Sequence, residues 1–134
     1  MREYEVVHEI FNLCSGNQMR DVFIEEIEIP EGVVRIGADV FAYCSGLESM
    51  VIPEGVASIG DGGFMHCTSL VEITIPKSIY SFGRGAFAGC NSLTRITYNG
   101  TKAQWDAIIR NSLPWDAALP ELCVVYCTDG QISN

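Results

Sequence analysis

Basic residues are scarce in this chain. Only 8 Lys and Arg stand against 17 Asp and Glu, which gives a formal net charge of −9 over 134 residues. A chain this acidic repels phosphate backbones, so the composition argues against nucleic-acid binding. Intrinsic disorder is excluded as well, because it requires low hydrophobicity with high net charge, and 48% of these residues are hydrophobic. The length fits one domain better than two.

Long apolar runs are also missing. No stretch approaches the roughly 18 consecutive apolar residues of a membrane helix. The N-terminal segment carries Arg2, Glu3, Glu5 and Glu9, and it has no apolar run long enough for the core of a signal peptide. As written, the sequence predicts a cytoplasmic protein without a membrane partner.

A repeat of 23 residues organises the middle of the chain. Within each unit, apolar residues two positions apart, such as Met50 and Ile52, indicate a short strand, and a proline ends it. One unit cannot bury its own apolar face, so the units are expected to stack and share one core. Five columns recur in a single register: Pro30, Pro53 and Pro76; Gly37, Gly60 and Gly83; Phe41, Phe64 and Phe87; Cys44, Cys67 and Cys90; and Leu47, Leu70 and Leu93.

One unit reads LESMVIPEGVASIGDGGFMHCTSL, and the next reads LVEITIPKSIYSFGRGAFAGCNSL. Over about residues 24–98 this IP…IG…F..C..L pattern resembles the BspA-like leucine-rich repeat, a bacterial repeat of the same period. The resemblance implies a leucine-rich-repeat solenoid, namely a short right-handed superhelix with parallel strands on its concave side and an irregular convex side. It also implies a surface-adhesion or protein-interaction module, which makes the cell surface the alternative location.

Both ends of such an array need caps, because open ends expose core and strand edge. We expect one domain with an N-terminal cap over 1–23, three and a partial repeats over 24–98, and a C-terminal cap over 99–134. The first cap reads as a hairpin-like strand, although residues 4–14 also fit a helix. In the second cap, Thr101 should N-cap a helix whose Trp105 closes the core, and one last strand should follow at 122–127.

No catalytic, cofactor-binding or metal-binding site is indicated. A metal site needs converging ligands, whereas cysteines spaced by 23 form a line, so these three are predicted to be reduced, buried thiols. His66 adjoins one of them but is expected on a convex corner, away from any reactive thiol. The glycine-rich runs lack the spacing of a phosphate-binding loop. We therefore predict a non-enzymatic protein. The thiols in question are Cys44, Cys67 and Cys90.

The outward face of the strands is the remaining candidate site. Leucine-rich arrays bind partners through such faces, and the positions here are polar, acidic at the front and without an aromatic anchor. We expect a protein partner of unknown identity on this face, while a merely solvated face also fits. The alternative hypothesis is a structural module that self-assembles through a strand edge or cap. In that case we expect a weak homo-oligomer. The face consists of two rows: Glu26, Ser49, Glu72 and Arg95, and beside them Glu28, Val51, Thr74 and Thr97.

Overall fold

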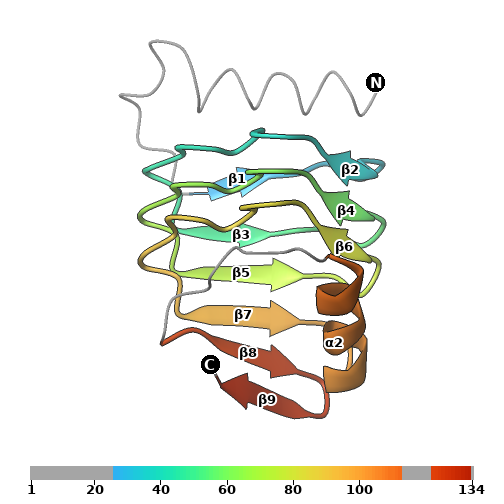
Figure 1. Cartoon of the computed structure of the whole chain (residues 1–134). Coiled ribbons are helices and arrows are strands. Elements are labelled where there is room, and N and C mark those ends of the chain that lie inside the picture. Colours follow the sequence, from blue (N-terminus) through green and yellow to red (C-terminus); the bar gives the residue numbers. More distant parts are fainter. Residues whose placement is uncertain (1–25, 113–121, 134) are drawn as a thin grey trace.

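The computed structural model describes residues 26–112 and 122–133, which form a stack of coils (Figure 1). Each of the first three coils contributes one strand to each of two sheets. The N-terminal cap predicted over 1–23, including the choice between strand and helix at 4–14, lies outside the described residues. Seven strands belong to the repeats: β1 (Glu26–Glu28), β2 (Arg35–Ile36), β3 (Ser49–Val51), β4 (Ser58–Ile59), β5 (Glu72–Ile75), β6 (Ser81–Phe82) and β7 (Arg95–Tyr98).

Among β1 to β7, neighbouring strands in both sheets come from successive repeats. One sheet has the order β1-β3-β5-β7-β8-β9, and the other has the order β2-β4-β6. Between repeats all pairing is parallel, and each residue pairs with the residue 23 positions later, as Met50 pairs with Ile73 and Ile73 with Ile96. This is the arrangement of parallel strands that the resemblance to leucine-rich repeats implies.

Three phenylalanines fill the centre of the stack. Phe41, Phe64 and Phe87 are fully buried, and their rings lie nearly parallel with centroids 5.0 and 5.7 Å apart. Each phenylalanine belongs to a different coil, so no coil encloses its own core. The apolar columns of the sequence therefore stabilise the fold only when the coils are stacked.

The glycine column reflects close contact between backbones of neighbouring coils. A Cβ atom at Gly60 would lie 2.9 Å from the amide nitrogen of Ala38, and one at Gly83 would collide with the backbone of Gly60 and Asp61. At Gly37 a Cβ atom would meet nothing closer than a Val40 methyl at 3.5 Å. At Gly60 and Gly83 there is no room for a side chain, because the backbone packs directly against the preceding coil. At Gly37 the structure leaves room for a Cβ atom.

The cysteine column is only partly as predicted. Cys67 and Cys90 are buried free thiols, and their Sγ atoms donate at 3.0 Å to the carbonyls of Phe41 and Phe64 respectively. The adjacent Cys90 thiol and burial raise the pKa of Cys67, which keeps it protonated. Cys44, however, is in a disulfide, so the prediction of a reduced thiol there is wrong. The 23-residue spacing makes the three cysteine positions equivalent in sequence. Their surroundings can still differ, because Cys44 lies in the first of the three coils that carry them.

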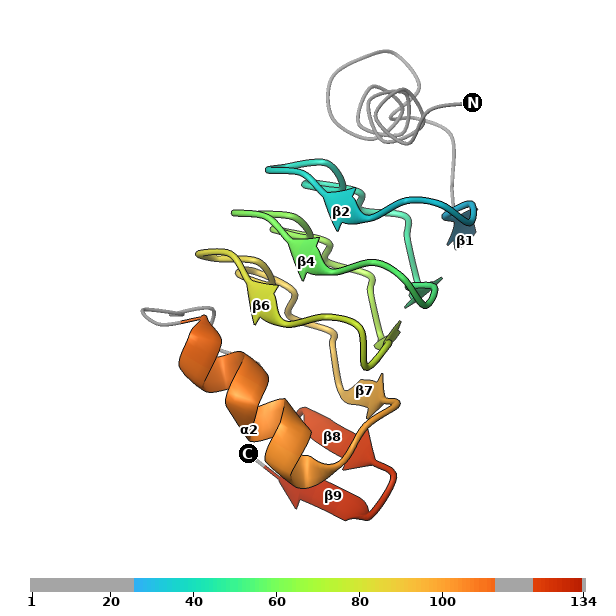
Figure 2. The ribbon, with the colours of Figure 1, turned by 90° about the vertical axis from the view of Figure 1, so that its right-hand side faces the viewer.

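The C-terminal helix α2 (Lys102–Asn111) begins as predicted. The Thr101 hydroxyl accepts from the backbone N–H of Gln104 at 3.2 Å, and the Gln104 side chain accepts from the N–H of Thr101 at 2.8 Å, which makes a capping box. Trp105 is 4% exposed and meets the rings of Phe82 and Tyr98 edge-on. In Figure 2 the helix continues the row of β2, β4 and β6.

The predicted final strand is present as β8 (Val124–Cys127), which pairs parallel with β7. It is not the last strand, because β9 (Gly130–Ser133) folds back antiparallel on it. The reversal occurs over the two-residue loop Thr128-Asp129, because Cys127 pairs with Gly130, and Gly130 has φ +137°. The expectation of a single closing strand is therefore wrong.

Candidate functional site

Parallel registers bring the predicted face residues into two straight rows on the six-stranded sheet. Glu26, Ser49, Glu72 and Arg95 are successive register partners, as are Glu28, Val51, Thr74 and Thr97. For β1 the description is limited to the backbone, so Glu26 and Glu28 are placed by register alone. We call this surface, with its continuation on β8, the sheet face.

The described side chains of the sheet face turn away from the core. Val51 is 64% exposed, and Glu72 and Arg95 are exposed as well. The alternate residues Met50, Ile73 and Ile96 are buried on the other side of the same strands. Since successive side chains of a strand point to opposite faces, one apolar row anchors the strands and leaves the rows beside it free for solvent or a partner.

Strand β8 extends the sheet face with an aromatic residue. In the parallel register, Val124 lies beside Arg95 and Tyr126 lies beside Thr97. The Arg95 guanidinium carbon is 4.4 Å from the centre of the Tyr126 ring, a cation–π contact. The prediction of a face without an aromatic anchor is therefore wrong.

The 23-residue period could not have located Tyr126. The chain between β7 and β8 contains α2 and leaves the period, so Arg95 pairs with Val124, which is 29 positions later. The sequence predicts a strand over 122–127, but a strand outside the repeat has no register that the repeat can fix.

The structure does not support a nucleophilic cysteine–histidine pair or a metal site at the residues considered in the sequence. The Cys67 thiol donates inward to the Phe41 carbonyl, whereas His66 is exposed on the corner of the coil, so the two do not form a reactive pair. Within residues 26–112 and 122–133, no three His, Cys, Asp or Glu side chains lie close enough to hold a metal ion. Over the same ranges, no helix has the length and apolar character needed to cross a bilayer.

The stacked coils, whose strands pair in parallel with a constant offset of 23 residues, are those of a leucine-rich-repeat protein. Residues 17–110 match the family model described as the BspA type leucine rich repeat region (6 copies), and the chain belongs to that family. The match extends beyond both ends of the 24–98 range over which the residues resemble this repeat. No curated protein matches the chain.

Two solved bacterial structures are similar to this chain. A leucine-rich repeat protein from Bacteroides ovatus is 32% identical, with a TM-score of 0.51 over 78% of this chain and 21% of its own length. A leucine rich cell surface protein from Faecalibacterium prausnitzii is 30% identical, with a TM-score of 0.42 over 63% of this chain and 35% of its own length. The chain therefore spans about a fifth and about a third of these two structures.

Proposed function

We propose that this protein is a non-enzymatic protein-interaction module that binds its partner through the sheet face. The observation that carries the proposal is the contact between Arg95 and Tyr126. Tyr126 continues the row of the sheet face that contains the exposed Val51, through the register partners Thr74 and Thr97. Arg and Tyr are enriched among the residues that dominate binding energy at protein interfaces. The parallel strands hold these side chains at fixed positions, so little conformational entropy is lost when a partner binds.

The Arg95–Tyr126 contact would orient the guanidinium for recognition. Arg presents five donors in a planar fork, and stacking on a ring leaves the edge of that fork available for a carboxylate. Glu72, the register partner of Arg95 on β5, places a negative charge one strand away. A partner that places an acidic group opposite Arg95 and a basic group opposite Glu72 would complement both.

The front of the sheet face adds to the charge pattern. Glu26 and Glu28 lie on β1, two strands from Glu72 and three from Arg95. The row therefore runs from acidic at β1 to basic at β7. We expect partner association to be fast at low salt and to slow as salt is added, because complementary fields act mainly on the rate of encounter.

The location that we propose is an oxidising compartment, outside the cytoplasm or at the cell surface. The support is the disulfide at Cys44, because glutathione and thioredoxin keep cytosolic thiols reduced in most bacteria. This replaces the cytoplasmic expectation drawn from the N-terminal residues. It agrees with the adhesion or interaction role that the family resemblance implies.

A second candidate function is self-assembly. Strand β9 is the terminal strand of the six-stranded sheet, and in the described part of the chain β8 is its single neighbour. An edge of this kind can accept a strand from another copy. A concentration series in size-exclusion chromatography with light scattering separates the candidates, because self-assembly predicts a mass that rises with concentration and the interaction module predicts a constant mass.

Charge reversal tests the preferred function once a partner has been captured. Glu72→Lys and Arg95→Glu should each weaken binding by about tenfold and change its salt dependence, with circular dichroism unchanged. Glu54→Lys, an exposed change in a turn outside the sheet face, is the matched control and should bind like the wild type. Partner binding that tolerates both reversals and fails with the turn variant would overturn the proposal.

A further inference from the structure

The corners of the coils contain two columns of residues with left-handed backbone. Four of these six positions hold residues that tolerate positive φ: Asp39 at 61°, Gly62 and Gly85 at 65°, and Gly89 at 77°. The other two hold Tyr43 at 65° and His66 at 58°, in the column that ends at Gly89. A tyrosine in this region is an outlier that costs on the order of 1 kcal/mol or more.

Stacking of the coils imposes this backbone at both aromatic residues. The Tyr43 N–H donates to the Met65 carbonyl at 2.8 Å, and the His66 N–H donates to the Ala88 carbonyl at 2.7 Å. The fold thus fixes the left-handed geometry whatever side chain is present, and Gly89 shows that glycine fills the same position. The presence of Tyr43 and His66 is therefore not required by the backbone.

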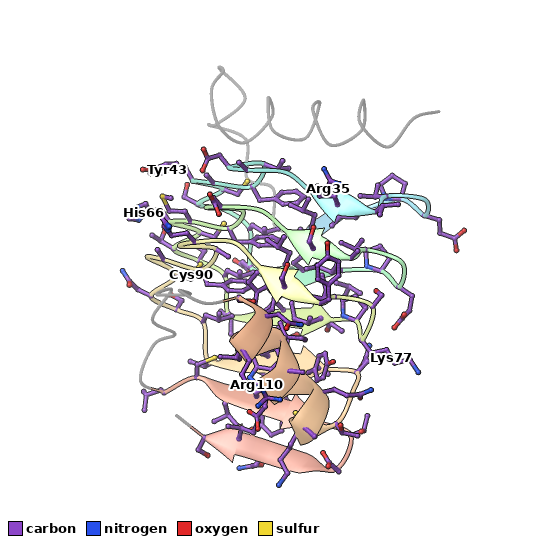
Figure 3. The ribbon with its side chains drawn as sticks, turned by 45° about the vertical axis from the view of Figure 1, so that its right-hand side comes forward. Arg35, Tyr43, His66, Lys77, Cys90 and Arg110 are labelled. Atoms are coloured by element: carbon purple, nitrogen blue, oxygen red, sulfur yellow. The ribbon has the colours of Figure 1, made fainter. Side chains whose placement is uncertain are left out.

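The two aromatic side chains form an exposed stack. Their ring centroids are 5.0 Å apart with an interplanar angle of 27°, and the His66 ring occupies the space that a side chain at Gly89 would take. Tyr43 is 59% exposed, and His66 is exposed too. Figure 3 shows the pair at one edge of the coil stack, on the edge opposite Lys77.

The three segments that form this corner contain no charged residue. Residues 40–47, 63–70 and 86–93 contain no Asp, Glu, Lys or Arg, although the protein as a whole carries a net charge of −9. Two or three residues C-terminal to this column, the same segments present exposed hydroxyl and amide groups. They are Ser45, Thr68, Asn91 and Ser92, and the Ser92 hydroxyl donates to the Thr68 carbonyl at 2.7 Å.

We propose that this corner, which we call the aromatic ridge, is a second binding site whose ligand is a neutral glycan chain. A sugar ring offers an apolar face of C–H groups to an aromatic ring and hydroxyls to polar side chains. The aromatic ridge supplies the face of the exposed Tyr43 ring that is turned away from His66, while His66 supports its other face. Polar side chains of the same segments supply the hydrogen-bonding groups. A neutral ligand also gains nothing from fixed charge and is not repelled by the acidic protein. An ionic partner would need complementary charges that the ridge lacks. The site is separate from the sheet face and does not depend on it.

The test is isothermal titration calorimetry of the full chain with neutral hexasaccharides of β-linked glucose, N-acetylglucosamine and mannose. At least one should bind, and Tyr43→Gly and His66→Gly should each raise its dissociation constant by about tenfold or more. Both variants should fold, because Gly89 occupies the equivalent position. Tyr43→Asn, which also tolerates positive φ, is a second variant that removes the ring. Val51→Ser on the sheet face is the matched control and should leave glycan binding unchanged.

The following results would overturn the proposal. The first is that none of the three hexasaccharides binds. The second is that binding persists in Tyr43→Gly and His66→Gly, which would place the glycan elsewhere. The third is that an anionic heparin hexasaccharide or a peptide binds the aromatic ridge while the neutral sugars do not. If these variants lower the melting temperature and leave binding unaffected, the stack serves stability alone and the proposal fails.

Discussion

The hydroxyl of Ser112 accepts a hydrogen bond from the backbone N–H of Phe82 at 2.8 Å and donates one to the carbonyl of Ile108 at 2.6 Å. Phe82 belongs to β6, the last strand of the three-stranded sheet, where another coil would otherwise supply the acceptor. Asn111 supports the same edge, since its Nδ2 donates to the Tyr80 carbonyl at 3.2 Å. The end of α2 thus replaces the missing coil with side chains.

Ser112→Ala should therefore destabilise the protein by about 1–3 kcal/mol, because it leaves a buried N–H without an acceptor. Urea unfolding followed by circular dichroism measures the change. Asn111→Ala is the comparison, and its exposed side chain should contribute no more than about 0.5 kcal/mol. Equal effects of the two substitutions would show that Ser112 does not cap β6.

Gly83→Ala and Gly37→Ala form a matched pair in one repeat column. The new methyl at Gly83 would collide with the backbone of Gly60 and Asp61, which cannot move without separating two coils. We expect a loss of about 3 kcal/mol or more. At Gly37 the nearest atom is 3.5 Å away and φ is not positive, so the change should be neutral or stabilise by up to about 1 kcal/mol. Thermal unfolding measures the stability of both variants. If Gly37→Ala destabilises the protein more than Gly83→Ala, close contact between coils does not explain the glycine column.

Trp105→Ala should cost about 3–5 kcal/mol in urea unfolding, as large aromatic deletions in cores do. The ring closes the end of the core against Phe82 and Tyr98, so its removal opens a cavity between the helix and the last repeat. A loss below about 1 kcal/mol would mean that α2 contributes little to the core.

Thiol labelling checks the three cysteines of the repeat column separately. Cys67 and Cys90 should resist a thiol reagent at pH 8 in native protein and react once denaturant is added, because both are buried and the pKa of Cys67 is raised by its Cys90 neighbour and by burial. Cys44 should stay unlabelled in denaturant until a reductant is present. Peptide mass spectrometry reads each site, and labelling of Cys44 without reductant would contradict the disulfide.

The repeat alone predicted those features that recur every 23 residues. The phenylalanine stack and the two rows of the sheet face follow from the period, because identical coils in parallel register must align identical positions. The features that the period could not predict occur where the symmetry is broken. They are the disulfide at Cys44, the register that brings Tyr126 beside Thr97, and the placement of Tyr43 against His66, which needs the backbone angles of the corner.

Site-specific photo-crosslinking tests whether the partner binds the sheet face. A benzophenone amino acid replaces Val51, which is 64% exposed on the sheet face, or Tyr80, which is 59% exposed beside the three-stranded sheet. After irradiation in the native cell, we expect one discrete protein adduct from position 51 and none from position 80, and we expect the adduct to be lost when Arg95→Glu is added. The same adduct from position 80 alone, or an adduct from position 51 that Arg95→Glu leaves intact, would contradict the assignment of binding to the sheet face.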